Sequence, residues 1–164
     1  MINLVGDGNF SLPVSSTPWE NLAEYPNQSR WVLSSGKACY NPGYVNNDTD
    51  ILWQSISIVS GKSYRVSFEV SGAWQYPGGP YDGEYNGGLN VRLGGVLVGQ
   101  VFADGSYSYD VTAGADGKIS IEGVHFYGDG SPLNLSIDNI KVMIAGAIIK
   151  GSLTGSILIG KGLV

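Results

Sequence analysis

The 164-residue sequence contains a single cysteine, Cys39, and a single histidine, His125. One cysteine excludes an internal disulfide and a cysteine-based metal clip. His125 stands in an apolar run with no serine or cysteine motif beside it, which favours a structural or surface histidine over a general base. The sequence also lacks a phosphate loop, a zinc-ligand spacing and a nucleotide-binding fingerprint. We therefore predict a protein that is not an enzyme and requires no cofactor.

Charged residues are scarce, at 14% of the chain, compared with about 25% in an average globular domain. The net charge of −5 has the wrong sign for neutralising phosphates, so we expect no nucleic-acid partner. Residues 1–138 hold all 14 acidic residues and six of the nine basic ones, whereas residues 139–164 hold three lysines and no acid. Such asymmetry indicates a terminal segment with a role of its own.

Long unbroken apolar runs are also missing. The first residues show neither the basic stretch nor the apolar core of a signal peptide, which predicts a chain made in the cytoplasm without export. The most apolar part is 143–164, but five glycines and Lys150 interrupt it. We therefore expect no membrane span.

Glycine and apolar residues are abundant, with 25 glycines and 43% hydrophobic residues. This hydrophobic content excludes intrinsic disorder, and no apolar pattern of helical period is long enough to predict a helix. Residues of strand character instead alternate between apolar and polar with turn signals between the runs, as in 51–58, 64–70, 89–93, 96–98, 107–111, 118–122 and 133–142. Near Asp138 the apolar phase slips by one residue, as at a β-bulge. The pattern predicts an all-β antiparallel sandwich.

The order of the motifs resembles that of jelly-roll carbohydrate-binding modules of the family 4, 9 and 22 type. The opening Leu4–Phe10, the strand at Trp31, the pair of segments 53–56 and 61–68, and the closing 135–142 are each similar to a motif of that group. The resemblance covers roughly residues 2–143. It implies a two-sheet jelly roll over residues 1–143, followed by an apolar, glycine-rich extension over residues 144–164.

The resemblance also implies a structural calcium ion that joins the N-terminal segment to the last strand. Asp138 aligns with a ligand of that group and Asp7 is a second candidate, because Ca²⁺ favours six to eight oxygen ligands. Ser11 stands where the group has a glutamate, which removes one ligand. The alternative is that Asp138 only accepts backbone hydrogen bonds at the bulge.

The loop that follows residue 73 combines aromatic rings with acids and amides. Sugars present apolar C–H faces and a fringe of hydroxyls, so flat rings flanked by carboxylates suit them. The candidate carbohydrate-binding residues are therefore Trp74, Tyr76, Tyr81, Asp82, Glu84 and Tyr85. The alternative is that these rings close the end of the sandwich or contact another subunit.

The C-terminal extension carries aliphatic side chains that a monomer rarely leaves exposed. We expect attachment or oligomerisation through Ile148, Ile149, Leu153, Ile157, Leu158, Ile159 and Leu163. The alternative is that the extension folds back on its own sandwich as edge strands.

Two functions are compatible with these features. The first is a non-enzymatic structural virion protein, such as a bacteriophage head-fibre, decoration or tail component. It would lie on the exterior of the virion, contact other subunits through the extension as a homo-oligomer, and aid adhesion to host glycans. The second is a stand-alone carbohydrate-binding module excised from a secreted glycoside hydrolase.

Overall fold

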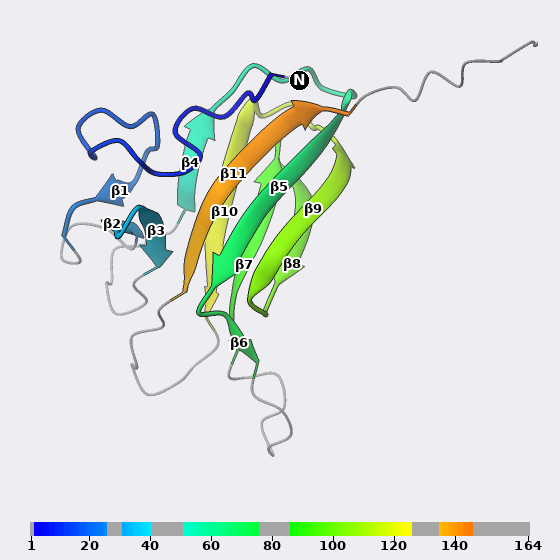
Figure 1. The fold of residues 1–164 in the computed structure, drawn as a ribbon. Coiled ribbons are helices and arrows are strands. Elements are labelled where there is room, and N and C mark those ends of the chain that lie inside the picture. Colours follow the sequence, from blue (N-terminus) through cyan, green and yellow to red (C-terminus); the bar gives the residue numbers. More distant parts are fainter. Residues whose placement is uncertain (1, 26–30, 41–50, 76–85, 126–134, 146–164) are drawn as a thin grey trace, which may run out of the picture.

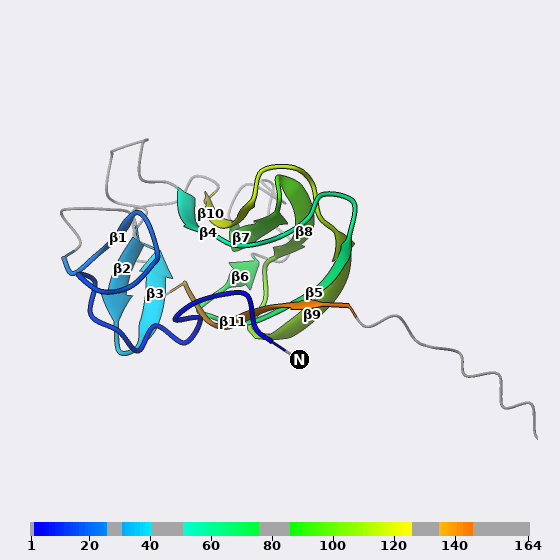
Figure 2. The ribbon, with the colours of Figure 1, turned by 90° about the horizontal axis from the view of Figure 1, so that it is seen from above.

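The computed structural model describes residues 2–25, 31–40, 51–75, 86–125 and 135–145. These residues form eleven strands and no helix. The strands build two sheets that lie face to face (Figures 1 and 2). The predicted all-β fold, an antiparallel sandwich of the jelly-roll type, is confirmed.

The first sheet has six strands and the second has five. In spatial order the first sheet contains β1 (Leu22–Ala23), β2 (Trp31–Ser34), β3 (Lys37–Tyr40), β11 (Ser136–Ile144), β5 (Ser63–Ser71) and β9 (Gly105–Thr112). The second sheet runs β4 (Ile51–Ser55), β10 (Lys118–His125), β7 (Asn86–Leu93) and β6 (Trp74–Gln75), and β8 (Val96–Val101) also pairs with β7. Every pairing is antiparallel except that of β1 with β2.

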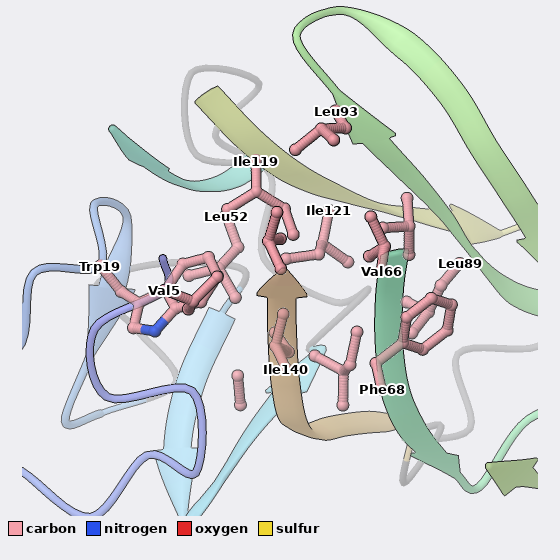
Figure 3. Packing of buried hydrophobic residues seen from close by; sticks show 14 of the residues in the cluster. Val5, Trp19, Leu52, Val66, Phe68, Leu89, Leu93, Ile119, Ile121 and Ile140 are labelled. Atoms are coloured by element: carbon pink, nitrogen blue, oxygen red, sulfur yellow. The ribbon is translucent and has the colours of Figure 1, made fainter. Parts of the chain in front are cut away.

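The core lies between the sheets and follows from the period-2 alternation of the strands. On β5 every second side chain is buried, and β7 and β10 alternate in the same way. Figure 3 shows these side chains meeting between the layers, with Val66 and Phe68 from β5 facing Leu89 and Ile121 from the second sheet. The opposite faces of the same strands are left for polar residues.

The predicted bulge is present in β11. The pairing of β11 with β5 shifts register between Asp138 and Lys141, and Asn139 within the bulge has a positive φ of 53°. The predicted hairpin turn is also present: Gly94 and Gly95 have φ values of 60° and 85°, a conformation open to glycine at no steric cost.

Two expectations for the strands need correction. The strand predicted over residues 51–58 ends at Ser55, because the amide of Ile58 bonds to the carbonyl of Ile56 and turns the chain. The described residues 22–25 and 31–40 form three short strands, of which only the one at Trp31 was predicted. Strands of two to four residues are too short to show a period.

The N-terminal segment pairs with the part of β11 that β3 does not reach, since β3 pairs with β11 only at Ser136 and Ile137. The Leu4 amide donates to the Val142 carbonyl at 2.9 Å, and the Ile140 amide donates to the Gly8 carbonyl at 2.8 Å. Gly8 lies so near the Ile140 carbonyl that a Cβ there would overlap it. Buried Gln54 holds the segment from the second sheet, since its side-chain amide accepts from the Gly6 N–H at 2.7 Å and donates to the Gly6 carbonyl at 2.8 Å.

Candidate functional site

The outer face of the second sheet carries a set of polar side chains in register. Glu122 on β10 lies opposite Asn90 on β7, and Asn90 lies opposite Gln100 on β8. Asn90 lies between two buried residues, Glu122 follows buried Ile121, and Gln100 is exposed next to buried Val101, so all three point away from the core. We call Glu122, Asn90 and Gln100 the polar ladder.

Hydrogen bonds connect the polar ladder across three strands. The Gln100 Nε2 donates to Asn90 Oδ1 at 3.0 Å, and the Asn90 Nδ2 donates to Glu122 Oε2 at 3.4 Å. Each side chain keeps further hydrogen-bonding capacity, because a carboxamide offers two donors and two acceptor sites and a carboxylate offers about four acceptor sites. The ladder is thus pre-oriented and still able to bind a polar ligand.

A second row runs beside the ladder. The backbone register places Trp53 of β4 opposite Ser120 of β10, Ser120 opposite Arg92 of β7, and Arg92 opposite Leu97 of β8. The ammonium group of Lys118 lies 4.0 Å from the centre of the Trp53 ring, a cation–π contact that limits the motion of the indole. Trp53 is half-buried and Leu97 is 47% exposed.

The two rows together offer the chemistry that neutral sugars require. An indole ring and an aliphatic side chain can contact C–H faces, while the carboxylate, the carboxamides, the hydroxyl and the guanidinium can exchange hydrogen bonds with sugar hydroxyls. The five strands hold these groups on a hydrogen-bonded scaffold instead of on a loop.

The predicted carbohydrate-binding loop starts and ends on this same sheet. Trp74 lies in β6 and pairs with Gly87 of β7, while Gln75 pairs with Asn86, so β7 carries both the base of the loop and Asn90. Figure 1 shows β6 at one end of the second sheet. The side chain of Trp74 and all of Tyr76, Tyr81, Asp82, Glu84 and Tyr85 lie outside the described residues, so their role in sugar binding stays a prediction.

The two predicted calcium ligands lie on neighbouring segments, since Gly8 contacts Ile140. The Asp7 carboxylate, however, already accepts four hydrogen bonds: two from Ser11, one from the Leu12 amide and one from the Thr17 hydroxyl. Asp138 Oδ1 accepts from the Asn139 amide. The part of the chain that the structure describes contains no group of three or more histidine, cysteine or acidic residues placed to hold a metal ion. These side chains do not by themselves form a calcium site, and calcium binding stays a prediction.

The other sequence-based candidates are placed as follows. Cys39 is half-buried on β3, and burial raises the pKa of its thiol. β11 runs to Ile144, one residue past the predicted domain boundary. The apolar extension from Ile148 to Leu163 lies outside the described residues. Among the residues that are described, no helix is long and apolar enough to span a bilayer.

Sequence reasoning missed the polar ladder, although a signal for it exists. Asn90, Arg92 and Glu122 each occupy the polar position of an alternating strand, whereas Gln100 follows the non-alternating run Val96–Gly99. Asparagine is depleted in strands, so Asn90 at the centre of a strand was the feature to follow. Only the strand register shows that these residues form one row.

Comparison with known proteins adds a structural similarity. No family model matches the sequence, and no curated protein matches it. A solved structure described as "CBM4 structure and function", where CBM4 denotes a family 4 carbohydrate-binding module, is similar over 86% of this chain and 99% of that chain. The sequence identity is 13% and the TM-score is 0.47.

Proposed function

We propose that this protein is a non-catalytic carbohydrate-binding domain whose binding site is the outer face of the second sheet. The observation that supports it most directly is the polar ladder, in which a carboxylate and two carboxamides from three strands are hydrogen-bonded side by side. A row of hydrogen-bonding groups across a sheet, with Trp53 and Leu97 beside it, suits an extended neutral glycan.

The test is calorimetric titration with a panel of soluble polysaccharides. Glu122→Gln is compared with Glu69→Gln as a matched control, since each carboxylate accepts a bond from an asparagine, Glu122 from Asn90 and Glu69 from Asn139. Glu69 lies on the outer face of the first sheet. We expect Asn90→Ala and Glu122→Gln each to weaken binding by about tenfold, a loss of one to two hydrogen bonds, and Glu69→Gln to leave it unchanged. Equal affinity for all four proteins contradicts the proposed face.

The loop makes a separable contribution. If the predicted ring platform also contacts sugar, Trp74→Ala and Tyr81→Ala weaken binding as well. If only the ladder variants lose affinity, the face suffices and the loop is removed from the site.

For the biological setting, we propose a structural virion protein such as a bacteriophage head-fibre, decoration or tail component, attached to other subunits through residues 144–164. The aliphatic content of that segment and its lack of acids support this role. A module of a secreted glycoside hydrolase remains the second candidate, because the carbohydrate-binding fold suits both. Light scattering on the full chain and on Ile149→Asp/Ile159→Asp distinguishes them: the virion role requires an assembly whose mass falls with the double substitution.

A further inference from the structure

Strand β9 forms one margin of the first sheet. It pairs with β5 over eight consecutive residues without a register shift. In the part of the chain that the structure describes, no strand pairs with its other side, and Figure 1 shows β9 as the last strand on that flank. A strand of this length and regularity offers a row of unpaired backbone groups to another chain.

The other described edges are short, partly covered or irregular. β1 and β6 have two residues each, β4 has five residues and is bridged by Glu20, and the pairing of β8 is interrupted by a register shift. Monomeric proteins protect long edges with lysine, proline or a bulge. The sequence of β9, GSYSYDVT, has none of these.

The direction of the backbone groups on β9 follows from its bonds to β5. The Ala113 amide donates to the Lys62 carbonyl, and the Ala113 carbonyl accepts from the Gly61 amide. The backbone N–H and C=O of Ala113 therefore point toward β5. Because these groups alternate in direction along an antiparallel strand, the backbone groups of Tyr107, Tyr109 and Val111 also point toward β5. The backbone groups of Ser106, Ser108, Asp110 and Thr112 face the open side, ready to pair.

We propose that the protein forms a two-fold symmetric homodimer in which β9 pairs antiparallel with β9 of a second copy, centred on Ser108. A two-fold interface uses the same surface on both subunits, and this register is self-complementary. Ser108 lies opposite the partner's Ser108, and Tyr107 lies opposite the partner's Tyr109. The first sheets of the two copies become one continuous sheet.

The side chains of β9 suit this pairing on both faces. Toward the core, Tyr107 and Tyr109 stack with an interplanar angle of 3° and are only half-buried, because they lie at the margin of the sandwich. Tyr109 packs against Gly99 of β8 and the Tyr107 hydroxyl donates to the Ala103 carbonyl, so pairing would place the parts of both rings that remain exposed beside the same rings of the second copy, and aromatic cross-strand pairs stabilise sheets. Toward solvent, Ser106 and Ser108 are small and exposed, so they do not hinder the approach.

The single charge on β9 is already neutralised within its own chain. Arg65 binds both carboxylate oxygens of Asp110, each at 2.8 Å. In the proposed register Asp110 lies opposite the partner's Ser106 and not opposite another acid. No like charges therefore meet across the two-fold axis, which favours a second copy as the occupant of this edge.

Two substitutions at exposed positions test both the pairing and its register. Ser108→Lys places two ammonium groups face to face on the axis, and like charges directly opposite each other destabilise a strand pair. Ser106→Lys instead places an ammonium group opposite the partner's Asp110. Sedimentation equilibrium of the full chain from low micromolar to submillimolar concentration measures the dimer, and circular dichroism confirms that both variants are folded.

We expect a reversible dimer in the unmodified protein, a dissociation constant raised about fivefold or more in Ser108→Lys, and one unchanged or lowered in Ser106→Lys. A protein that is monomeric over the whole range overturns the proposal. So does an assembly whose mass Ser108→Lys leaves unchanged, which would indicate that other surfaces, such as the C-terminal extension, account for all of the association. A dimer weakened equally by both lysines overturns the Ser108-centred register.

Discussion

The link between Gln54 and Gly6 allows a prediction about stability that depends on one proton. Gln54 is 3% exposed, and its side-chain amide bonds to both the N–H and the carbonyl of Gly6. Gln54→Glu keeps the shape of the side chain and the acceptor for the Gly6 N–H. It removes the donor for the Gly6 carbonyl whenever the new carboxyl group is ionised.

The magnitude follows from these two contacts. At neutral pH the ionised variant leaves the Gly6 carbonyl without its donor, brings a carboxylate oxygen against it, and buries the charge. Leaving one buried group unsatisfied costs about 1–3 kcal/mol, and more when a charge is involved. We expect the free energy of unfolding to fall by about 3 kcal/mol or more, which for a chain of this length corresponds to a Tm lower by about 6–12 °C.

The effect should be smaller in acid. Burial and the neighbouring carbonyl raise the pKa of the introduced carboxyl group above its unfolded value of about 4.3. A group whose pKa is raised on folding stabilises the native state below its unfolded pKa and loses that contribution as pH rises through its folded pKa. When protonated, the carboxyl group can again donate to Gly6, so the variant should approach the unmodified protein near the low end of the range in which both remain folded.

Urea unfolding of the unmodified protein and of Gln54→Glu, measured in parallel at a series of pH values, gives the difference in unfolding free energy at each pH. Gln100→Glu is the matched control, since Gln100 belongs to the same sheet but is exposed, and it should change stability little. A difference for Gln54→Glu that stays below about 1 kcal/mol, or that does not depend on pH, would refute the role assigned to the Gln54–Gly6 contact.

Three further predictions concern other parts of the molecule. Gly123→Ala should lower the free energy of unfolding by about 1–3 kcal/mol, because its Cβ would overlap the buried Tyr40 ring; Ser120→Ala on the same strand is the control, and equal melting temperatures would contradict this packing. If Asp7 and Asp138 bind calcium, calcium at 100 times its Kd should raise the free energy of unfolding by about 2.7 kcal/mol and Asp138→Asn should abolish the gain, whereas identical melts in calcium and chelator contradict the site. Arg65 holds the pKa of Asp110 below its usual value by hydrogen bonding. At pH values above the unfolded pKa of Asp110 this pair should therefore stabilise the fold by a small amount, and the stabilisation should be lost as pH falls through the folded pKa. Asp110→Asn, measured by unfolding across acidic pH, should remove this pH dependence.

The long strands could be predicted from the sequence because a strand that buries one face alternates between apolar and polar residues. Tyr64, Val66, Phe68 and Val70 are all buried on β5, and a period of two has no other simple explanation. The bulge at Asp138 was predictable for the same reason, since an extra residue reverses the alternation and leaves a visible phase slip.

The polar ladder could not be predicted because the sequence of one strand does not determine which residues of the neighbouring strands lie opposite it. Asn90 and Gln100 are ten residues apart across the Gly94–Gly95 turn, but Glu122 comes from a distant part of the chain. The partner of Gln54 was hidden in the same way, since the residue it holds is Gly6, whose backbone and not its side chain makes the contact. Sequence patterns identify which side chains leave the core, whereas only the fold decides which of them become neighbours.

The proposed glycan-binding face and the β9 edge belong to different sheets, so both proposals can be tested in one measurement. The polar ladder points outward from the second sheet, while β9 pairing extends the first sheet and leaves the ladder open. A dimer would present two faces, and two linked sites bind a polymer more tightly than one by raising the effective concentration of the second contact. Ser108→Lys should therefore weaken binding to a long polysaccharide and leave binding to a short oligosaccharide unchanged, whereas Glu122→Gln should weaken both. If Ser108→Lys reduces affinity for the short ligand as well, the edge and the face are not independent and the assignment of the site to the second sheet is wrong.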